Sequence, residues 1–330
     1  MAKLDRTRRR AVAATLAVVA VAAVALLRPG PWFRSAAPDP GATAAPVEFR
    51  PTPAADWGSS PLALPGDWVV TSAVRRGSGW VLDRGRNRYL PAEGHRGVWP
   101  APQGGAVAVI DDDTHPRQIG LADANHQRIT WTRVGWATGQ PQWSPDGRRL
   151  ALTTSDKETG TFSFGVLGTD GRFRRFPVDT KRYFCTDYCS FTWTRDGREV
   201  ALQQTDAFAP RSETARHPRW GVQLFSADDG RPTRLVRMPG DPAGPWAWSP
   251  DGKLVVVQGQ QEALLVETAD GRVVRPLPTA DVAFVSNDRL LYRRPHGRED
   301  FVLTDLAARE LVRQPVPSEL VDREISVAPR

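Results

Sequence analysis

The chain has 330 residues, of which 40% are hydrophobic, enough for a sizeable core, and it carries a formal net charge of +7. Residues 1–34 hold seven basic side chains against one acid, whereas the rest of the chain holds 37 basic and 36 acidic side chains. Because a nucleic-acid site needs a basic patch on the folded domain, this balance argues against nucleic-acid binding. The 57 Gly and Pro residues and twelve Trp favour an all-β, turn-rich fold.

The N-terminus carries a basic segment, residues 1–10, followed by an uncharged apolar run over 11–27. A run of this length is at the short end of a membrane-spanning helix, and the preceding arginines predict that the N-terminus stays in the cytoplasm. We therefore expect a single-pass anchor at the cell membrane, with the rest of the chain outside. Secretion after signal cleavage is the alternative. The Pro-, Ala- and Gly-rich stretch over 28–57 is predicted to be an extended linker.

Over residues 58–330 the strongest signal is a recurring turn, in which Trp, Ser or Thr, a variable residue, Asp and Gly precede an apolar strand. Ser or Thr, Pro, Asp and Gly suit the successive positions of a type I turn, and Trp can fill the space between neighbouring sheets. Weaker copies lie near residues 66, 105 and 288, and a second tight turn follows the first in each repeat. The clear copies contain Trp143, Pro145, Asp146 and Gly147; Trp193, Asp196 and Gly197; and Trp248, Pro250, Asp251 and Gly252.

These turns resemble the Trp-Ser-Pro-Asp-Gly turn of TolB-type and WD-like β-propeller repeats. The resemblance covers residues ~58–315 and implies a single β-propeller of about six four-stranded blades. In that family the repeat is structural and has no catalytic residues, so the resemblance transfers architecture only. A propeller needs its first and last blades tied together, and both Val47–Arg50 and Glu324–Val327 are candidates for the tying strand.

The two cysteines, Cys185 and Cys189, are four positions apart. In an exported chain the simplest interpretation is a local disulfide, with free thiols as the alternative. Two thiols are too few for a structural zinc site, and the acidic run Asp111–Asp113 is predicted to be a solvated turn. We therefore predict neither a metal site nor a cofactor.

Within each predicted blade, the two tight turns lie on one face and the variable loops on the other, where function is usually carried. Two variable loops, over 181–190 and 206–219, combine aromatic and charged residues and are expected to adjoin. We predict that they form a binding patch for a protein or cell-envelope partner; ordinary surface loops whose aromatics cover the core are the alternative. The predicted patch residues are Arg182, Tyr183, Phe184, Asp187, Tyr188, Arg216, His217 and Trp220.

The sequence lacks the local motifs of common catalytic sites: a Gly-x-Ser-x-Gly turn, a phosphate-binding Gly loop and a His-Glu-x-x-His helix. We therefore predict a monomeric, non-catalytic binding or scaffold protein with no catalytic residues. The alternative is a hydrolase or lyase acting on carbohydrate or peptide, which needs acidic or His side chains to converge at the channel mouth. A solute-binding sensor is a third interpretation.

Overall fold

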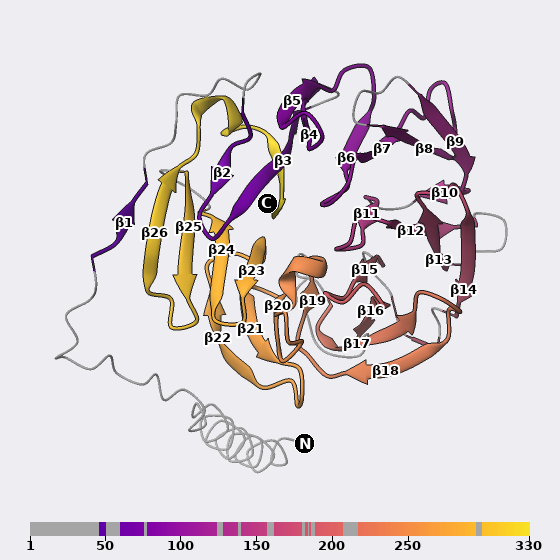
Figure 1. Ribbon diagram of the computed structural model, residues 1–330. Coiled ribbons are helices and arrows are strands. Elements are labelled where there is room, and N and C mark those ends of the chain that lie inside the picture. The colour runs from indigo at the N-terminus through magenta and orange to yellow at the C-terminus, as the bar shows by residue number, and fades with distance from the viewer. Residues whose placement is uncertain are drawn as a thin grey trace, which may run out of the picture. The chain divides into compact units, whose positions relative to one another are not determined.

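The computed structural model describes residues 46–50, 60–75, 78–123, 128–137, 140–156, 162–179, 182–183, 185, 189–206, 217–294 and 299–330. Six β-sheets stand around a central axis as the blades of a propeller, which confirms the predicted fold class and blade number (Figure 1). Among these residues the helices are two single-turn 3-10 helices, η1 (Pro245–Ala247) and η2 (Ser318–Leu320).

The first three blades are antiparallel sheets that begin at the axis and end at the rim (Figure 1). Blade 1 contains β27 (Glu324–Pro329), β3 (Trp68–Arg75), β4 (Ser78–Asp83) and β5 (Arg88–Pro91), with β2 (Ala63–Leu64) also paired to β3. Blade 2 contains β6 (Gly97–Pro100), β7 (Ala106–Ile110), β8 (Gln118–Asp123) and β9 (Ile129–Arg133). Blade 3 contains β10 (Trp136–Ala137) and β11 (Gln142–Trp143), both paired to β12 (Arg149–Ser155), then β13 (Phe162–Gly168) and β14 (Phe173–Val178).

The other three blades repeat this order. Blade 4 contains β15 (Phe191–Trp193), β16 (Glu199–Thr205), β17 (Arg219–Ser226) and β18 (Pro232–Val236). Blade 5 contains β19 (Asp241–Pro242), β20 (Leu254–Gln258), β21 (Ala263–Glu267) and β22 (Val273–Leu277). Blade 6 contains β23 (Val282–Ser286), β24 (Arg289–Arg293), β25 (Asp300–Asp305) and β26 (Glu310–Pro315), with β1 (Glu48–Phe49) parallel to β26 at its outer edge.

The C-terminal candidate strand ties the ring. Strand β27 pairs antiparallel with β3, from Glu324 opposite Val74 to Pro329 opposite Trp68, and so becomes the axial strand of blade 1. The N-terminal candidate forms only the two-residue strand β1 on the outside of blade 6. Six paired residues against two indicate that β27 supplies the closure.

The recurring turns close as predicted. In blade 4 the Gly197 N–H donates to the Thr194 carbonyl (3.0 Å), and Thr194 Oγ1 donates to Asp196 Oδ1 (2.7 Å). Asp196 Oδ1 also accepts a bond from the Arg198 N–H (3.1 Å). The glycines of the three clear copies have φ between 65° and 69°, which favours Gly. The same contacts recur in Ser144–Gly147 and Ser249–Gly252.

The hydrophobic core lies between the blades, in six clusters that each join two adjacent sheets. The repeat tryptophans belong to these clusters, and Trp193 is completely buried. Its Nε1 donates to the Gln142 carbonyl on the axial strand of blade 3 (2.8 Å), and Trp143 Nε1 bonds the Trp99 carbonyl of blade 2 in the same way. These indoles therefore fill the space between sheets, as predicted, and also bond them together.

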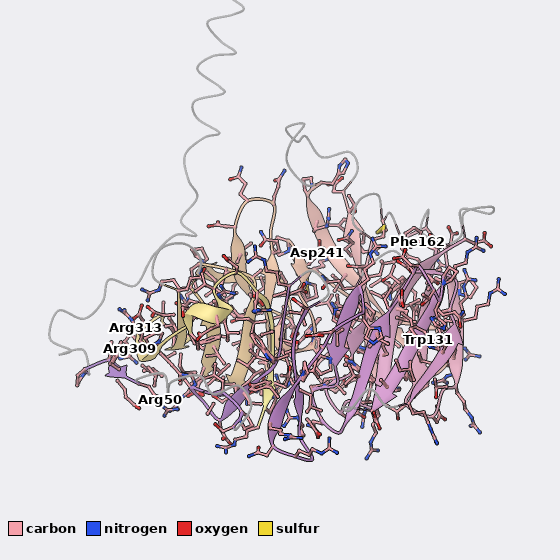
Figure 2. All side chains as sticks on the ribbon, turned by 90° about the horizontal axis from the view of Figure 1, so that it is seen from above. Arg50, Trp131, Phe162, Asp241, Arg309 and Arg313 are labelled. Carbon is pink, nitrogen blue, oxygen red and sulfur yellow. A yellow bond between two sulfur atoms is a disulfide. The ribbon has the colours of Figure 1, made fainter. Side chains whose placement is uncertain are left out.

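The strand order places the tight turns on one face of the ring, here called the turn face, and the longer connections on the opposite face, the loop face. Asp241 and Phe162, which begin strands after such connections, both lie near the upper rim in Figure 2, and Arg50 lies near the lower rim. The predicted anchor over 11–27 lies outside the described residues. No helix in the described part of the chain has the length and apolar character needed to cross a membrane.

Candidate functional site

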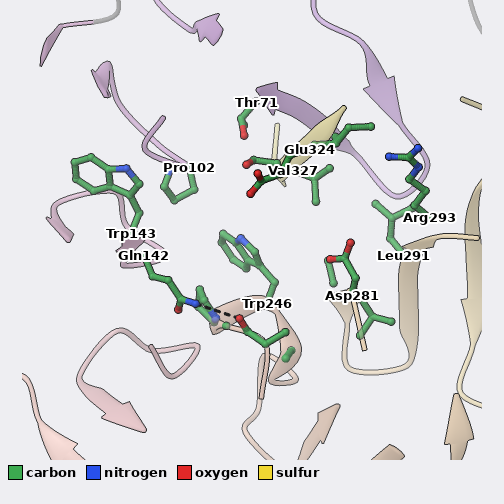
Figure 3. A pocket seen from close by; sticks show the side chains of 18 of the residues that line it. Thr71, Pro102, Gln142, Trp143, Trp246, Asp281, Leu291, Arg293, Glu324 and Val327 are labelled. Carbon is green, nitrogen blue, oxygen red and sulfur yellow. Dashed lines mark hydrogen bonds between the residues drawn. The ribbon is translucent and has the colours of Figure 1, made fainter. Parts of the chain in front are cut away.

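A cavity of ≈ 380 Å³ lies at the axis of the propeller (Figure 3). The axial strands of blades 1, 2, 3 and 6 and the segment that follows β19 in blade 5 line it, and no described residue of blade 4 does. Most of its wall is apolar, with a few polar groups among the described residues. The apolar wall includes Trp99, Pro102, Trp143, Trp246, Leu291 and Val327, and the polar groups include Thr71, Gln142, Asp281, Arg293, Arg323 and Glu324.

Two carboxylates mark the loop-face end of this axial pocket. Asp281 directly precedes β23, which runs from the loop face down to the turn at 287–288. Glu324 begins β27 and pairs with Val74 near the end of β3, so it lies at the same end. Figure 3 shows the side chains of Asp281, Glu324 and Trp246 directed into one hollow.

Asp281 is held in an unfavourable environment for its charge. Its side chain is reached by water, yet protein surrounds it within the channel, and the resulting loss of solvation raises the pKa of its carboxyl above the ordinary value. The positive charge of Arg293 opposes this shift and the negative charge of Glu324 adds to it. Among the described residues, no hydrogen bond to the Asp281 carboxylate is formed, whereas Glu324 accepts one from Gln140 Nε2 (3.1 Å).

The two arginines of the pocket are occupied by other partners. Arg293 contacts the Glu299 carboxylate and the Val321 carbonyl, and its Nη1 donates to the Arg323 carbonyl (3.1 Å). Arg323 donates from Nε to the Glu319 carbonyl (2.9 Å), and its guanidinium lies 4.3 Å from the centre of the Trp80 ring. Arg293 is therefore paired with a carboxylate, whereas the Arg323 guanidinium bonds a backbone carbonyl and packs on an aromatic ring.

The aromatic side of the pocket comes from blade 5, where a 3-10 helix follows the short axial strand β19. Strand β19 ends after two residues, and Pro245 then begins η1, which carries the half-buried Trp246 into the channel. The Trp68 ring packs edge-on against it, with ring centres 5.1 Å apart. The Arg195 guanidinium lies 4.5 Å from the Trp246 ring centre; burial lowers the pKa of Arg195 to about 10, so it remains a cation at neutral pH.

The predicted disulfide is confirmed: Cys185 and Cys189 are bonded, with Cα atoms 5.8 Å apart. Its loop connects to the neighbouring long loop through side chains. Gln203 Nε2 lies 3.5 Å from Cys185 Sγ, and Gln203 Oε1 accepts a bond from Arg219 Nη2 (3.1 Å). Arg219 in turn pairs with Asp241 of blade 5 (3.0 Å). The described ends of the two loops are therefore linked, as the sequence predicts.

Four residues of the predicted patch are described. Tyr183 packs edge-on against Phe225 in the core between blades 3 and 4, and the Arg182 guanidinium lies 5.5 Å from the Tyr183 ring centre. The His217 carbonyl accepts a bond from Arg219, and Trp220 is 41% exposed. Tyr183 thus covers the core, while Trp220 is available at the surface. The other predicted patch residues, Phe184, Asp187, Tyr188 and Arg216, lie outside the described residues.

None of the four described patch residues lines the axial pocket, and of the pocket residues sequence reasoning named only Trp143, as a structural residue of its turn. The repeat itself offered a signal, because residues shortly before the repeat Trp lie on the axial strand. Gln142 directly precedes Trp143, and Asp281 stands three residues before Phe284, which occupies the position of the Trp in blade 6. The pocket lining contains no His, and no group of three or more His, Cys, Asp or Glu able to hold a metal ion occurs among the described residues. The arrangement can therefore bind a ligand through charge and apolar contact.

No protein-family model and no curated protein matches the chain. Solved structures match it at low identity. Hydrazine synthase of Kuenenia stuttgartiensis is 14% identical, covering 74% of this chain and 82% of that chain, with a TM-score of 0.46. The β-propeller domain of the Trilobed protease from Pyrococcus furiosus is 12% identical, covering 77% and 83%, with a TM-score of 0.49. Pyrococcus horikoshii acylaminoacyl peptidase is 14% identical, covering 72% and 42%, with a TM-score of 0.45. The assignment to the propeller fold rests on the six sheets of this chain.

Proposed function

We propose that this protein is an exported, non-catalytic binding propeller with TolB-type repeats, which holds a cell-envelope ligand or partner at its loop face. The axial pocket carries the proposal. Its volume of ≈ 380 Å³ and its mixed wall, in which apolar side chains surround a few convergent polar groups, are typical of ligand sites. A carboxyl whose pKa is raised by its surroundings, here Asp281, is also characteristic of functional sites.

The disulfide supports export. Bonds of this kind persist in oxidising compartments and are rare in the cytosol. Together with the basic segment and the apolar run over 1–27, the bond favours a position outside the cytoplasm, reached through a membrane anchor or by secretion.

The patch around the disulfide loop supports a protein or cell-envelope partner. The disulfide and the bonds from Gln203 and Arg219 hold the described ends of both loops against blades 4 and 5. The exposed Trp220 stands beside them, and exposed Trp is enriched where proteins bind one another. The patch and the mouth of the pocket lie on the same face of the ring.

A second candidate is a channel-mouth hydrolase or lyase, and the pairing of Asp281 with Glu324 favours it. A carboxyl whose pKa is raised, here Asp281, can act as an acid beside a second carboxylate. The binding proposal ranks first because the described residues that line the pocket include no His to serve as a general base.

The pocket is tested with a set of small soluble compounds of mixed charge, observed by ligand-detected NMR. Binding that is lost in Trp246→Ala and kept in Trp220→Ala assigns the compounds to the axial pocket. Compounds recovered unchanged after long incubation support a binding function. Turnover that disappears in Asp281→Asn supports the enzyme instead, and an absence of binders that depend on Trp246 contradicts the pocket as the site.

The loop patch is tested by photocrosslinking in cells, with the crosslinker at Tyr188 or His217 and a control at Asp146 on the turn face. We expect one discrete protein adduct from the loop positions and none from the control. Equal labelling from both faces, or none from either loop position, contradicts a partner at this patch.

A further inference from the structure

We infer that the axial pocket binds a small organic ammonium ion, with its charge between Asp281 and Glu324 and its apolar part against Trp246. This inference rests on the proposed function, because it assumes that the pocket is a binding site and names the class of ligand. Both carboxylates lie at the loop-face end of the axis, and the Trp246 ring, which contacts Trp68 and Arg195 on its turn-face side, lines the same cavity (Figure 3).

The charges of the pocket favour a cation, because Glu299 pairs with Arg293 and leaves two carboxylates facing Arg323 in the lining. Asp281 and Glu324 face the cavity, and no described residue bonds the Asp281 carboxylate. The two arginines of the lining are engaged by Glu299 and by backbone carbonyls of the segment over 319–323. An ammonium group donates hydrogen bonds and brings the charge that the carboxylate pair lacks.

The wall of the pocket selects an organic cation over a hydrated metal ion. A hard metal ion prefers several oxygen ligands, and the described residues supply no group of three or more metal-binding side chains here. Trp246, Pro102 and Val327 instead offer apolar surface to a hydrocarbon stem. The Arg195 guanidinium lies 4.5 Å from the Trp246 ring centre, which is the kind of cation–aromatic contact that this ring can make.

The loss of solvation at Asp281 gives the site a dependence on pH. The charged groups that face this carboxyl are Arg293 on β24 and Glu324 on β27, with Arg323 beside them in the lining. A bound cation favours the ionised carboxyl, so binding requires Asp281 to be deprotonated. Because its pKa is raised, ammonium binding weakens as the pH falls through that value, at a higher pH than an ordinary Asp would give.

The experiment is isothermal titration calorimetry at pH 7.5 with matched probes. Phenethylamine, 2-phenylethanol and 3-phenylpropionate share a ring and chain and differ in charge; the corresponding amine, alcohol and carboxylate on cyclohexyl and pentyl stems extend the set. We expect at least one amine to bind ten or more times tighter than its alcohol. Asp281→Asn should weaken that amine at least tenfold and remove its pH dependence, whereas Asp322→Asn, an acid outside the axial pocket, should change its Kd less than threefold.

The outcomes separate this inference from the proposed function. If alcohols or carboxylates bind as tightly as the amines, and this binding is lost in Trp246→Ala, the ligand is not required to be a cation. The pocket then remains a binding site. If no amine binds, or if Asp281→Asn leaves its Kd unchanged while a circular dichroism melt shows the variant folded, the inference is wrong. The NMR screen with Trp246→Ala then decides the proposed function by itself.

Discussion

The axial strands carry carboxylates at both faces of the ring, and the two sets are held in opposite ways. At the turn face, Asp196 and Asp251 each accept a hydroxyl bond and a backbone N–H bond inside their own turns. The Ser249 hydroxyl and the Lys253 N–H hold the pKa of Asp251 below its ordinary value. At the loop face, loss of solvation raises the pKa of Asp281, which faces Glu324.

This difference shows where the fold is stabilised and where it carries a cost. A carboxylate with local donors favours the folded chain in its ionised form, whereas one without donors and beside a second acid disfavours it. Proteins commonly accept such a cost at binding sites. We therefore expect the clear turns to stabilise their blades, whereas the loop face carries the proposed binding site.

The largest effect is expected at the turn end of blade 4. Trp193→Ala removes a completely buried indole and its bond to the Gln142 carbonyl, and should lower the free energy of unfolding by about 3–5 kcal/mol. Denaturant unfolding followed by circular dichroism measures it. Trp220→Ala, at an exposed loop-face position, is the matched control and should change stability by no more than about 0.5 kcal/mol. If both variants lost the same free energy of unfolding, the turn face would contribute no more to stability than the loop face.

A smaller effect is expected inside one turn. Thr194→Val keeps the shape of a buried side chain but removes the donor to Asp196 and the acceptor for the Glu199 N–H. The free energy of unfolding should fall by about 1–2 kcal/mol in the same unfolding experiment. Thr130→Val, at an exposed position on β9, serves as control and should be nearly neutral. A neutral Thr194→Val would show that the turn bonds do not stabilise the blade.

The smallest effect, with the opposite sign, is expected in the channel. The folded pKa of Asp281 is raised, so its ionised form opposes folding at neutral pH, and this penalty fades as the pH falls through that pKa. Asp281→Asn should therefore raise Tm by about 1–3 °C at pH 7.5, allowing for screening by the water in the channel, and by less at pH 4. Thermal melts of both proteins across this pH range measure it. A lower Tm at pH 7.5 would mean that the carboxylate stabilises the fold.

The turns and the blade number could be predicted because each depends on residues close together in the sequence. Thr194, Asp196 and Gly197 specify their turn without help from elsewhere. The closing strand was left open between two candidates, since its pairing joins residues that no local pattern connects. The axial pocket was missed for the same reason: Asp281, Glu324 and Trp246 come from three segments that only the closed ring brings together.

The pairing of β27 with β3 also sets an order of events during synthesis. Strand β3 (Trp68–Arg75) leaves the ribosome about 250 residues before its axial partner β27 (Glu324–Pro329). Until β27 arrives, the backbone groups on the axial edge of β3 have no strand to pair with. Contacts between such distant residues form slowly, so the ring should close late in folding. Glu324 lies on that late strand, so the proposed binding site forms only in chains that have completed closure. A copy without the paired β27 does not place Glu324 beside Asp281, so the proposed ligand would distinguish finished molecules from unfinished ones.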